Sequence, residues 1–255
     1  FFFFFFFPSA CVYPGQLCHA AVCPPLPRPC LAVVLSCCGA GLITRLWVFF
    51  LGTQERAVMG RQVSTAVSDL ALAASAVWGF RALSLLVGID RRFGKWWFML
   101  QTLAATLGTV RFGQLMPSYQ SSVERYHKNF SWLCRAIGVP CLAAEVCIMT
   151  GHNTPGQGFL VLAVACFVAS SIKSRHKDKM VELVNVLSVL TIIGLAVAGG
   201  RIMFVWAGAL FVTSALVGAE GEVFGVQRVD VFHYLLVGVN YCLVEGFRGP
   251  SVAAS

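Results

Sequence analysis

The amino-acid sequence predicts an all-α fold: a polytopic bundle of transmembrane helices with 6–7 spans after residue 59. Of the 255 residues, 58% are apolar and only 12% are charged, and the mean hydropathy is +0.77. A soluble chain has about 45–50% apolar and about 25% charged residues, so part of the apolar excess must face lipid. Apolar stretches long enough to cross a bilayer recur from Val67 onward, separated by short charged loops.

The first 58 residues are predicted to be separate from this bundle. Seven phenylalanines open the chain, and a proline-rich run follows at Cys23–Cys30. A signal peptide has a basic first region that this segment lacks, so we expect residues 1–58 to be a spurious or disordered extension. Two alternatives stay open: a cysteine-rich secreted arm, or an extra hydrophobic segment over residues 30–51. The predicted transmembrane domain is 59–248, followed by a short tail, 249–255.

Each predicted span has about 20 mostly apolar residues, because hydrocarbon offers no partners to backbone polar groups. Ser68 and Asp69 lie where the first span is expected to begin, as candidate N-cap residues. Gly199-Gly200-Arg201 is so short that the fifth and sixth spans must form an antiparallel hairpin. The last segment is marginal and could lie along the interface. In order, the segments are Val67–Ile89, Trp96–Met116, Phe130–Thr150, Gln157–Ile172, Val181–Ala198, Ile202–Ala219 and Val231–Phe247.

Loop charges predict an orientation if all seven segments cross the membrane. Basic residues are more frequent in cytosolic loops. One side collects Arg61, Arg111, Arg125, Lys128, Lys173, Arg175, Lys177, Lys179 and Arg228, and the other collects Arg91, Arg92, Lys95, Arg201 and Arg248. The first side is therefore expected to be cytosolic, and the glycosylation sequon Asn129-Phe-Ser131 is expected to be unused.

Three charged residues fall inside predicted spans: Arg81, Arg135 and Glu145. A charge at the centre of a membrane helix costs about 2.5–3.5 kcal/mol on insertion scales, so it normally faces a partner inside the bundle. Arg135 and Glu145 are about 15 Å apart along one helix and cannot pair there. We therefore hypothesise that Glu145 pairs with Arg81. The pair would serve as a site for a substrate, ion or lipid headgroup, or as a structural ion pair.

Other chemical motifs are weak. The cysteines from Cys134 onward show no C-x-x-C spacing and are expected to act as small apolar residues, so no metal site and no cofactor is predicted. His233 and Tyr234 could suggest an acid/base site like that of membrane sterol isomerases. We favour an interfacial aromatic belt for this segment, which also contains Asn240, Tyr241 and Glu245. Glycines within the spans are expected to allow close helix packing.

Three apolar motifs carry a resemblance to a known family: STAVSDLALAASA (Ser64–Ala76), LQTLAATLGTV (Leu100–Val110) and the region of VNYCLVEGF (Val239–Phe247). On these motifs, residues 59–250 resemble the transmembrane protein 276 family. It implies a multi-pass membrane architecture, and it supplies neither an activity nor catalytic residues. The first 58 residues have no counterpart in the family.

The sequence thus predicts a multi-pass integral membrane protein of an endomembrane or the plasma membrane, with an interaction, assembly or scaffold role. Its expected partners are the lipid bilayer and other membrane proteins. Nucleic acid is not expected, because no basic patch interleaved with aromatic residues occurs. An enzyme is not expected either, because known intramembrane catalytic motifs are missing. The alternative is a small transporter or lipid-handling protein that uses Arg81, Arg135 and Glu145.

Overall fold

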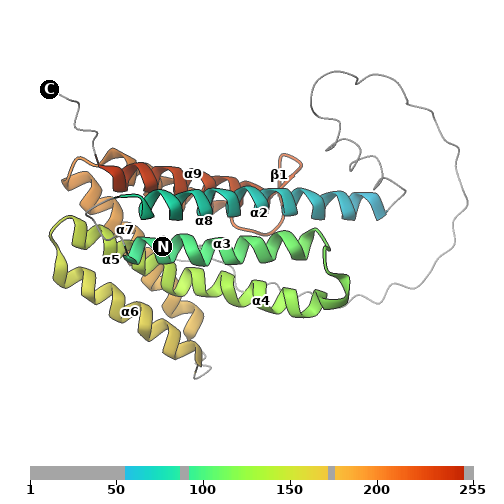
Figure 1. The fold of residues 1–255 in the computed structure, drawn as a ribbon, viewed down its shortest axis with the longest axis horizontal. Helices are drawn as coiled ribbons and strands as arrows, with labels where there is room; N and C mark the ends of the chain where they lie inside the picture. Colours follow the sequence, from blue (N-terminus) through green and yellow to red (C-terminus); the bar gives the residue numbers. More distant parts are fainter. Residues whose placement is uncertain (1–54, 87–91, 172–175, 250–255) are drawn as a thin grey trace, which may run out of the picture. The chain divides into compact units, whose positions relative to one another are not determined.

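The computed structural model describes residues 55–86, 92–171 and 176–249. Residues 1–54 of the predicted extension, with the possible extra segment over 30–51, and residues 250–255 of the predicted tail lie outside the described residues. From Gly60 onward, the described residues belong to one compact unit. They lie almost entirely in helices (Figure 1), which confirms the all-α prediction.

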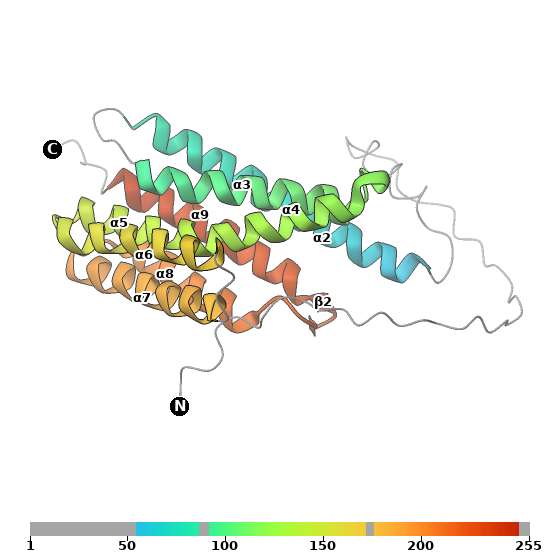
Figure 2. The same cartoon turned by 90° about the horizontal axis from the view of Figure 1, so that it is seen from below.

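The helices follow one another with short connections. In order they are α2 (Glu55–Ser84), α3 (Arg92–Phe112), η1 (Pro117–Tyr119), α4 (Gln120–Leu133), η2 (Cys134–Gly138), α5 (Val139–Met149), α6 (Asn153–Ser171), α7 (Lys177–Ala198), α8 (Ile202–Val217) and α9 (Arg228–Arg248). Figures 1 and 2 show the long helices running alternately in opposite directions along a common axis. Helices that are consecutive in sequence therefore pack against each other, as α7 and α8 do.

The helix formed by α4, η2 and α5 is continuous but contains one wide turn. The residues of η2 are π-helical, and the Val139 N–H bonds to the Cys134 carbonyl five residues earlier. Pro140 follows directly. It has no N–H to donate to the Ala136 carbonyl, so the regular α-helical pattern cannot continue through this turn. A π-bulge is a common way to absorb such an interruption.

A small hairpin connects α8 to α9. Strands β1 (Glu222–Val223) and β2 (Val226–Gln227) pair antiparallel. Between them, Phe224 and Gly225 both have positive φ, 51° and 79°. Positive φ at both central residues is typical of the type I′ turn that two-residue hairpins favour.

Among the described residues, three helical segments are long and apolar enough to cross a membrane: Gln62–Ser84, Pro117–Met149 and Lys177–Ala198. Asn153–Ala169 and Ile202–Val217 are apolar but shorter. The structure therefore supports three of the 6–7 predicted spans by this measure. The helices α3 and α9 match predicted spans in position, but charged residues near their ends make them more polar.

The predicted N-cap role of Ser68 and Asp69 is wrong. The helix α2 begins at Glu55, so both residues lie well inside it and are buried. Sequence reasoning placed the helix start at the beginning of the apolar stretch. The helix actually extends beyond that stretch toward the N-terminus.

The predicted hairpin of α7 and α8 is confirmed. The helix α7 ends in a Schellman motif, in which Gly200 has φ of 65° and the Arg201 N–H bonds to the Ala196 carbonyl at 2.8 Å. The Gly200 N–H bonds to the Val197 carbonyl at 3.3 Å. A residue other than glycine would be strained at this φ.

Glycines let several helices approach closely, as predicted. A Cβ at Gly79 would meet the Phe98 ring, and one at Gly246 would meet the Phe204 ring. In turn, Phe204 packs edge-on against Phe247, with ring centroids 5.1 Å apart. These contacts join α2 to α3 and α8 to α9 in the apolar core of the bundle.

Candidate functional site

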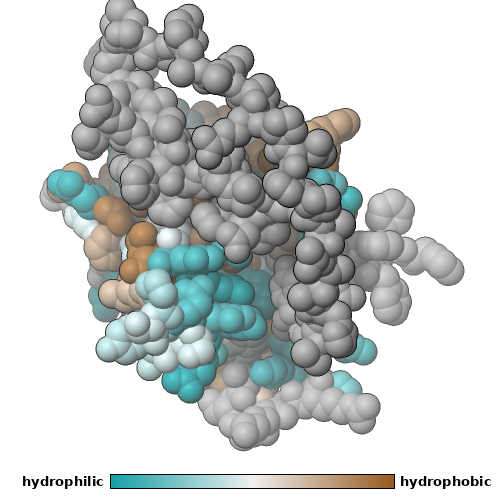
Figure 3. All heavy atoms as spheres, turned by 90° about the vertical axis from the view of Figure 1, so that its right-hand side faces the viewer, coloured by the Kyte–Doolittle hydropathy of each residue, from teal (hydrophilic) through white to brown (hydrophobic). Residues whose placement is uncertain are grey.

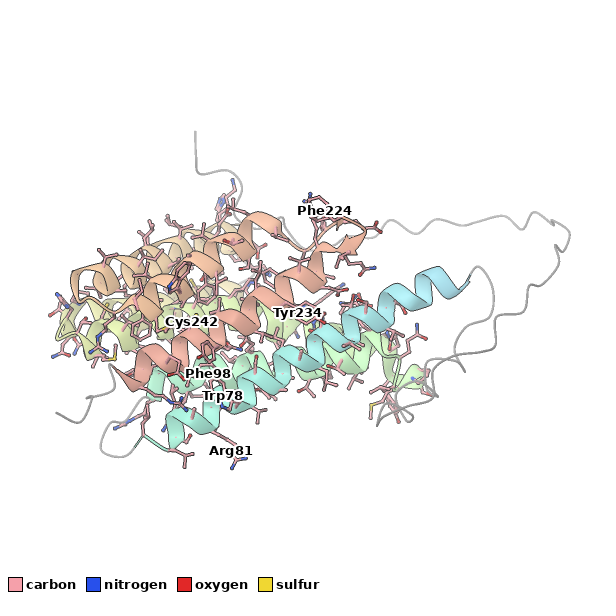
Figure 4. All side chains as sticks on the ribbon, turned by 90° about the horizontal axis from the view of Figure 1, so that it is seen from above. Trp78, Arg81, Phe98, Phe224, Tyr234 and Cys242 are labelled. Carbon is pink, nitrogen blue, oxygen red and sulfur yellow. The ribbon has the colours of Figure 1, made fainter. Side chains whose placement is uncertain are left out.

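The first and last described helices, α2 and α9, are joined by polar side chains, most of which are buried. We call this group the α2–α9 polar cluster. On α2 it comprises Ser64, Thr65, Ser68 and Asp69, and on the α9 side it comprises Gln227, Asp230 and His233. Thr65, Ser68, Asp69 and Asp230 are each at most 1% exposed, and His233 is 8% exposed. In Figure 4, α2 and α9 lie next to each other, and hydrogen bonds join them across more than 160 residues of sequence.

The carboxylate of Asp230 accepts two hydroxyl hydrogen bonds from α2. Ser64 Oγ donates to Asp230 Oδ2 at 2.5 Å, and Ser68 Oγ donates to Asp230 Oδ1 at 3.0 Å. Beside them, Thr65 Oγ1 donates a third hydrogen bond, to Gln227 Oε1 at 2.9 Å. Hydrogen bonds to a charged acceptor are stronger than neutral ones, so these contacts hold α9 against one face of α2.

His233 connects this pair of bonds to the second carboxylate. Its Nδ1 lies 3.0 Å from Ser68 Oγ, and its Nε2 lies 3.5 Å from Asp69 Oδ1. The result is a chain of polar contacts that runs from Asp69 through His233 and Ser68 to Asp230. Two carboxyl groups and an imidazole thus share one buried site, where an unbalanced charge is expensive.

Asp69 lies against the backbone of α3. A Cβ at Gly108 would come within 2.8 Å of Asp69 Oδ1 and closer still to Oδ2, so only glycine leaves room for the carboxyl group. Asp69 Oδ2 is buried and has no hydrogen-bond partner in the protein. Buried polar atoms are nearly always paired with protein or water, which makes this oxygen unusual.

A second polar group lies at the nearby ends of α3 and α4, and we call it the Arg111 group. Arg111 Nη2 donates to Glu124 Oε1 at 3.0 Å, and Arg111 Nη1 lies 3.2 Å from His127 Nδ1. Lys128 pairs with Glu124 at 2.7 Å. The charge of Arg111 acts on Asp69. Figure 3 looks onto this end of the molecule and shows hydrophilic residues gathered there.

A smaller set of polar side chains lies between α2 and α9, seven residues further along both helices. Trp97 Nε1 donates to Asn240 Oδ1 at 3.0 Å, and Asn240 Nδ2 donates to Ser75 Oγ at 2.9 Å. Ser75 and Asn240 are each seven residues after a member of the cluster, Ser68 and His233, so this set and the cluster are about 10 Å apart. Gln101 of α3 is also buried and has no partner for its side-chain amide.

The predicted pair of Arg81 and Glu145 is wrong. Arg81 is exposed, points away from the helices in Figure 4 and makes no ion pair with Glu145. Glu145 is 2% exposed, and its Oε2 accepts the N–H groups of Phe93 and Gly94 at 3.0 and 3.3 Å. These groups belong to the first turn of α3, whose unpaired N–H groups and positive dipole end favour a carboxylate. Glu145 is therefore a helix cap supplied by a neighbouring helix.

Arg135 lies apart from both Arg81 and Glu145. It is half-buried in η2, and the carboxylate of Asp178 in the first turn of α7 attracts its guanidinium. The three residues predicted from the sequence therefore do not form one site, because they occupy three separate parts of the bundle.

Sequence reasoning missed the α2–α9 polar cluster. It assigned Ser68 and Asp69 to a helix start and His233 to an interfacial belt. The belt is consistent with Tyr234 and Tyr241, which are 51% and 55% exposed, but His233 and Asn240 are buried. A usable signal was present: Ser64 and Ser68 are four residues apart, so they share a face of one apolar helix.

The cysteines from Cys134 onward are free and buried, in agreement with small apolar residues. Among the described residues, no group of three or more His, Cys, Asp or Glu side chains is placed to hold a metal ion. No protein-family model, curated protein or solved structure matches the chain. The resemblance to the transmembrane protein 276 family therefore stays a prediction.

Proposed function

We propose that the protein is a multi-pass integral membrane protein that crosses the bilayer seven times. The passes would be α2, α3, the continuous segment Pro117–Met149, α6, α7, α8 and α9. Their alternating directions support this arrangement, and so does the length of α3 and α9, which at 21 residues each extend about 31 Å. That length matches about 30 Å of hydrocarbon.

Exposed apolar side chains support the same proposal. Large apolar residues that are at least 44% exposed occur along α6 and α7, among them Val161, Val164, Phe167, Leu183, Leu187 and Leu190. Exposed apolar patches of this extent are unfavourable in water. Lipid, or the helix of another membrane protein, would cover them.

Within the membrane, we propose an interaction or assembly role. The observation that carries it is the exposed face of α7, where Gly194 has no atom within 4 Å of a Cβ built on it. Ala198 follows four residues later and is also exposed. Small residues at this spacing allow a second membrane helix to approach closely.

Cross-linking of the protein in native membranes tests this role. We expect Gly194→Ile to reduce the cross-linked species, because the larger side chain keeps a partner helix away. Gly158→Ile on α6 is the matched control, since Gly158 is exposed and equally free of neighbours. Equal cross-linking of the two variants and the wild type would refute an assembly role for this face.

A small transporter is the second candidate, and the α2–α9 polar cluster favours it. Ionisable residues inside membrane helices commonly mark ion or substrate pathways. The residues involved would then be Asp69, Asp230 and His233, and not Arg81, Arg135 and Glu145. Ion flux into liposomes that contain the protein tests this candidate, with Asp69→Asn as the variant expected to abolish flux.

A further inference from the structure

The contacts within the α2–α9 polar cluster need one more hydrogen than its side chains carry when both carboxyl groups are ionised and the imidazole is neutral. Three contacts in a row join Asp230 Oδ1 to Ser68 Oγ, Ser68 Oγ to His233 Nδ1, and His233 Nε2 to Asp69 Oδ1. Each contact needs one hydrogen to be a hydrogen bond. If both carboxyl groups are ionised and the imidazole is neutral, only two hydrogens are present, one on Ser68 and one on His233.

The contact that lacks a hydrogen is the one between His233 Nε2 and Asp69 Oδ1. Ser68 has one hydroxyl hydrogen and two acceptors at 3.0 Å, Asp230 Oδ1 and the Thr65 carbonyl. The charged carboxylate is the stronger acceptor, so Ser68 donates to Asp230 and His233 must donate to Ser68 through Nδ1. Nε2 then has a lone pair that faces the Asp69 carboxyl group. This contact is the longest of the three, at 3.5 Å, whereas the others are 3.0 Å. Two acceptors that face each other repel, and one added proton turns the contact into a hydrogen bond.

We propose that the α2–α9 polar cluster is a proton-binding site in which Asp69 is protonated and donates a hydrogen bond to His233 Nε2. All donors then point the same way, from Asp69 through His233 and Ser68 to Asp230. A neutral Asp69 is favoured over a charged pair with His233, because both groups are buried and a buried ion pair is expensive to desolvate. The remaining negative charge lies on Asp230, where two serine hydroxyls stabilise it.

The buried position of Asp69 supports proton binding independently of this count. Asp69 is 1% exposed, and its Oδ2 has no hydrogen-bond partner. An ionised carboxylate with an unpaired oxygen in such a place is highly unfavourable. A protonated carboxyl group loses much less on burial, since it carries no net charge.

The Arg111 group is the neighbouring polar group that is partly exposed to solvent. Glu124 and Lys128 have side chains 39% and 50% exposed, whereas Arg111 is 19% exposed. His127 contacts Arg111. The charged or titratable groups around the site are thus Asp69 on α2, Arg111 on α3, Glu124, His127 and Lys128 on α4, and Asp230 and His233 on α9. Arg228, at the start of α9, is exposed.

Proton binding at this site requires neither an assembly role nor a transport role. It is tested by infrared spectroscopy of the full chain in lipid, with 13C-labelled aspartate. The sequence has four aspartates, Asp69, Asp90, Asp178 and Asp230, so the label isolates few carboxyl groups. We expect a protonated aspartate band near pH 7 that is lost in Asp69→Asn. Asp178→Asn is the matched control, because Asp178 is exposed and outside the cluster, and it should keep the band.

Ser68→Ala keeps the experiment decisive if Asp69→Asn does not fold. Without the Ser68 hydroxyl, the His233 hydrogen can move to Nε2 and bond to Asp69, so the extra proton is no longer needed. The pH midpoint of the band should fall by about one to two units, the equivalent of one hydrogen bond to a charged group. Any one of four results would overturn the proposal: the wild-type protein lacks the band, the band survives in Asp69→Asn, the midpoint is unchanged in Ser68→Ala, or the site responds to Na⁺ and not to pH.

Discussion

Replacing Gly208 by alanine should separate close helix packing from helix propensity. Gly208 of α8 faces Ile193 of α7, and a Cβ at this position would lie 2.8 Å from Ile193 Cδ1 and closer still to Cγ1. Ordinary carbon contacts are about 3.5–4.0 Å. Ile193 cannot easily move aside, because a β-branched side chain in a helix has one strongly preferred rotamer.

The expected size of the effect follows from two opposing terms. Overpacking costs about 1–3 kcal/mol, whereas alanine gains about 0.8–1.0 kcal/mol over glycine in a helix interior. Gly208→Ala should therefore lower the free energy of unfolding by up to about 2 kcal/mol. Gly158→Ala on α6 is the control, because Gly158 lies outside the contact of α7 with α8 and outside the face proposed for assembly. It meets nothing within 4 Å and should raise stability by up to about 1 kcal/mol.

The assay is reversible unfolding in detergent micelles, followed by circular dichroism. A double-mutant cycle with Ile193→Ala completes it, because the remaining Ile193 Cβ lies 3.7 Å from the new methyl group, an ordinary contact. The two changes should couple by about 1–3 kcal/mol in the stabilising direction. Additive effects, or a Gly208→Ala protein as stable as Gly158→Ala, would refute the close approach of α7 and α8.

Three further predictions concern the polar contacts. Asn240→Leu should lower the free energy of unfolding by about 1–3 kcal/mol, because it leaves Trp97 Nε1 without an acceptor and removes the hydrogen bond that Ser75 Oγ accepts; Tyr241→Phe, on the exposed side of the same helix, should change it by less than about 0.5 kcal/mol. Glu145→Gln should lower it by about 0.5–2 kcal/mol through the lost charge at the start of α3, with faster hydrogen exchange at the Phe93 and Gly94 amides. Above about pH 7, where the histidines of the unfolded chain are neutral, stability should fall by up to about 1.4 kcal/mol per pH unit while the folded state holds one more proton than the unfolded state, and it should level off once Asp69 loses its proton in the folded state. Asp69→Asn should flatten this dependence, and an equally steep curve in that variant would contradict the proton assignment.

The helices were predictable from sequence because their apolar stretches are long and their loops short. The α7–α8 hairpin followed from Gly199-Gly200, where only three residues connect two apolar segments. The start of α2 was not predictable in the same way. Its first turns precede the apolar stretch, so hydropathy alone placed the beginning of the helix too late.

Which residues form the candidate site depends on which helices contact each other, and the spacing of residues in the sequence does not determine these contacts. Glu145 looked like the partner of Arg81, but Arg81 is exposed, and two backbone N–H groups at the start of α3 bond to the Glu145 carboxylate. Asp69 and His233 are more than 160 residues apart, and only the packing of α2 beside α9 brings them together. Polar residues on one face of each helix were visible in the sequence, but which helices faced each other was not.

The most direct test of the seven-pass bundle is glycosylation mapping with acceptor sites inserted singly at residues 199–201 and 218–225, in a protein whose own sequon at Asn129 is removed. If α8 crosses the membrane, these two connections lie on opposite sides, and only one of the two acceptors is glycosylated. If only Gln62–Ser84, Pro117–Met149 and Lys177–Ala198 cross, both connections lie on the same side. Equal glycosylation of the two sites would contradict the seven-pass arrangement, and glycosylation at 199–201 alone is the result that it predicts.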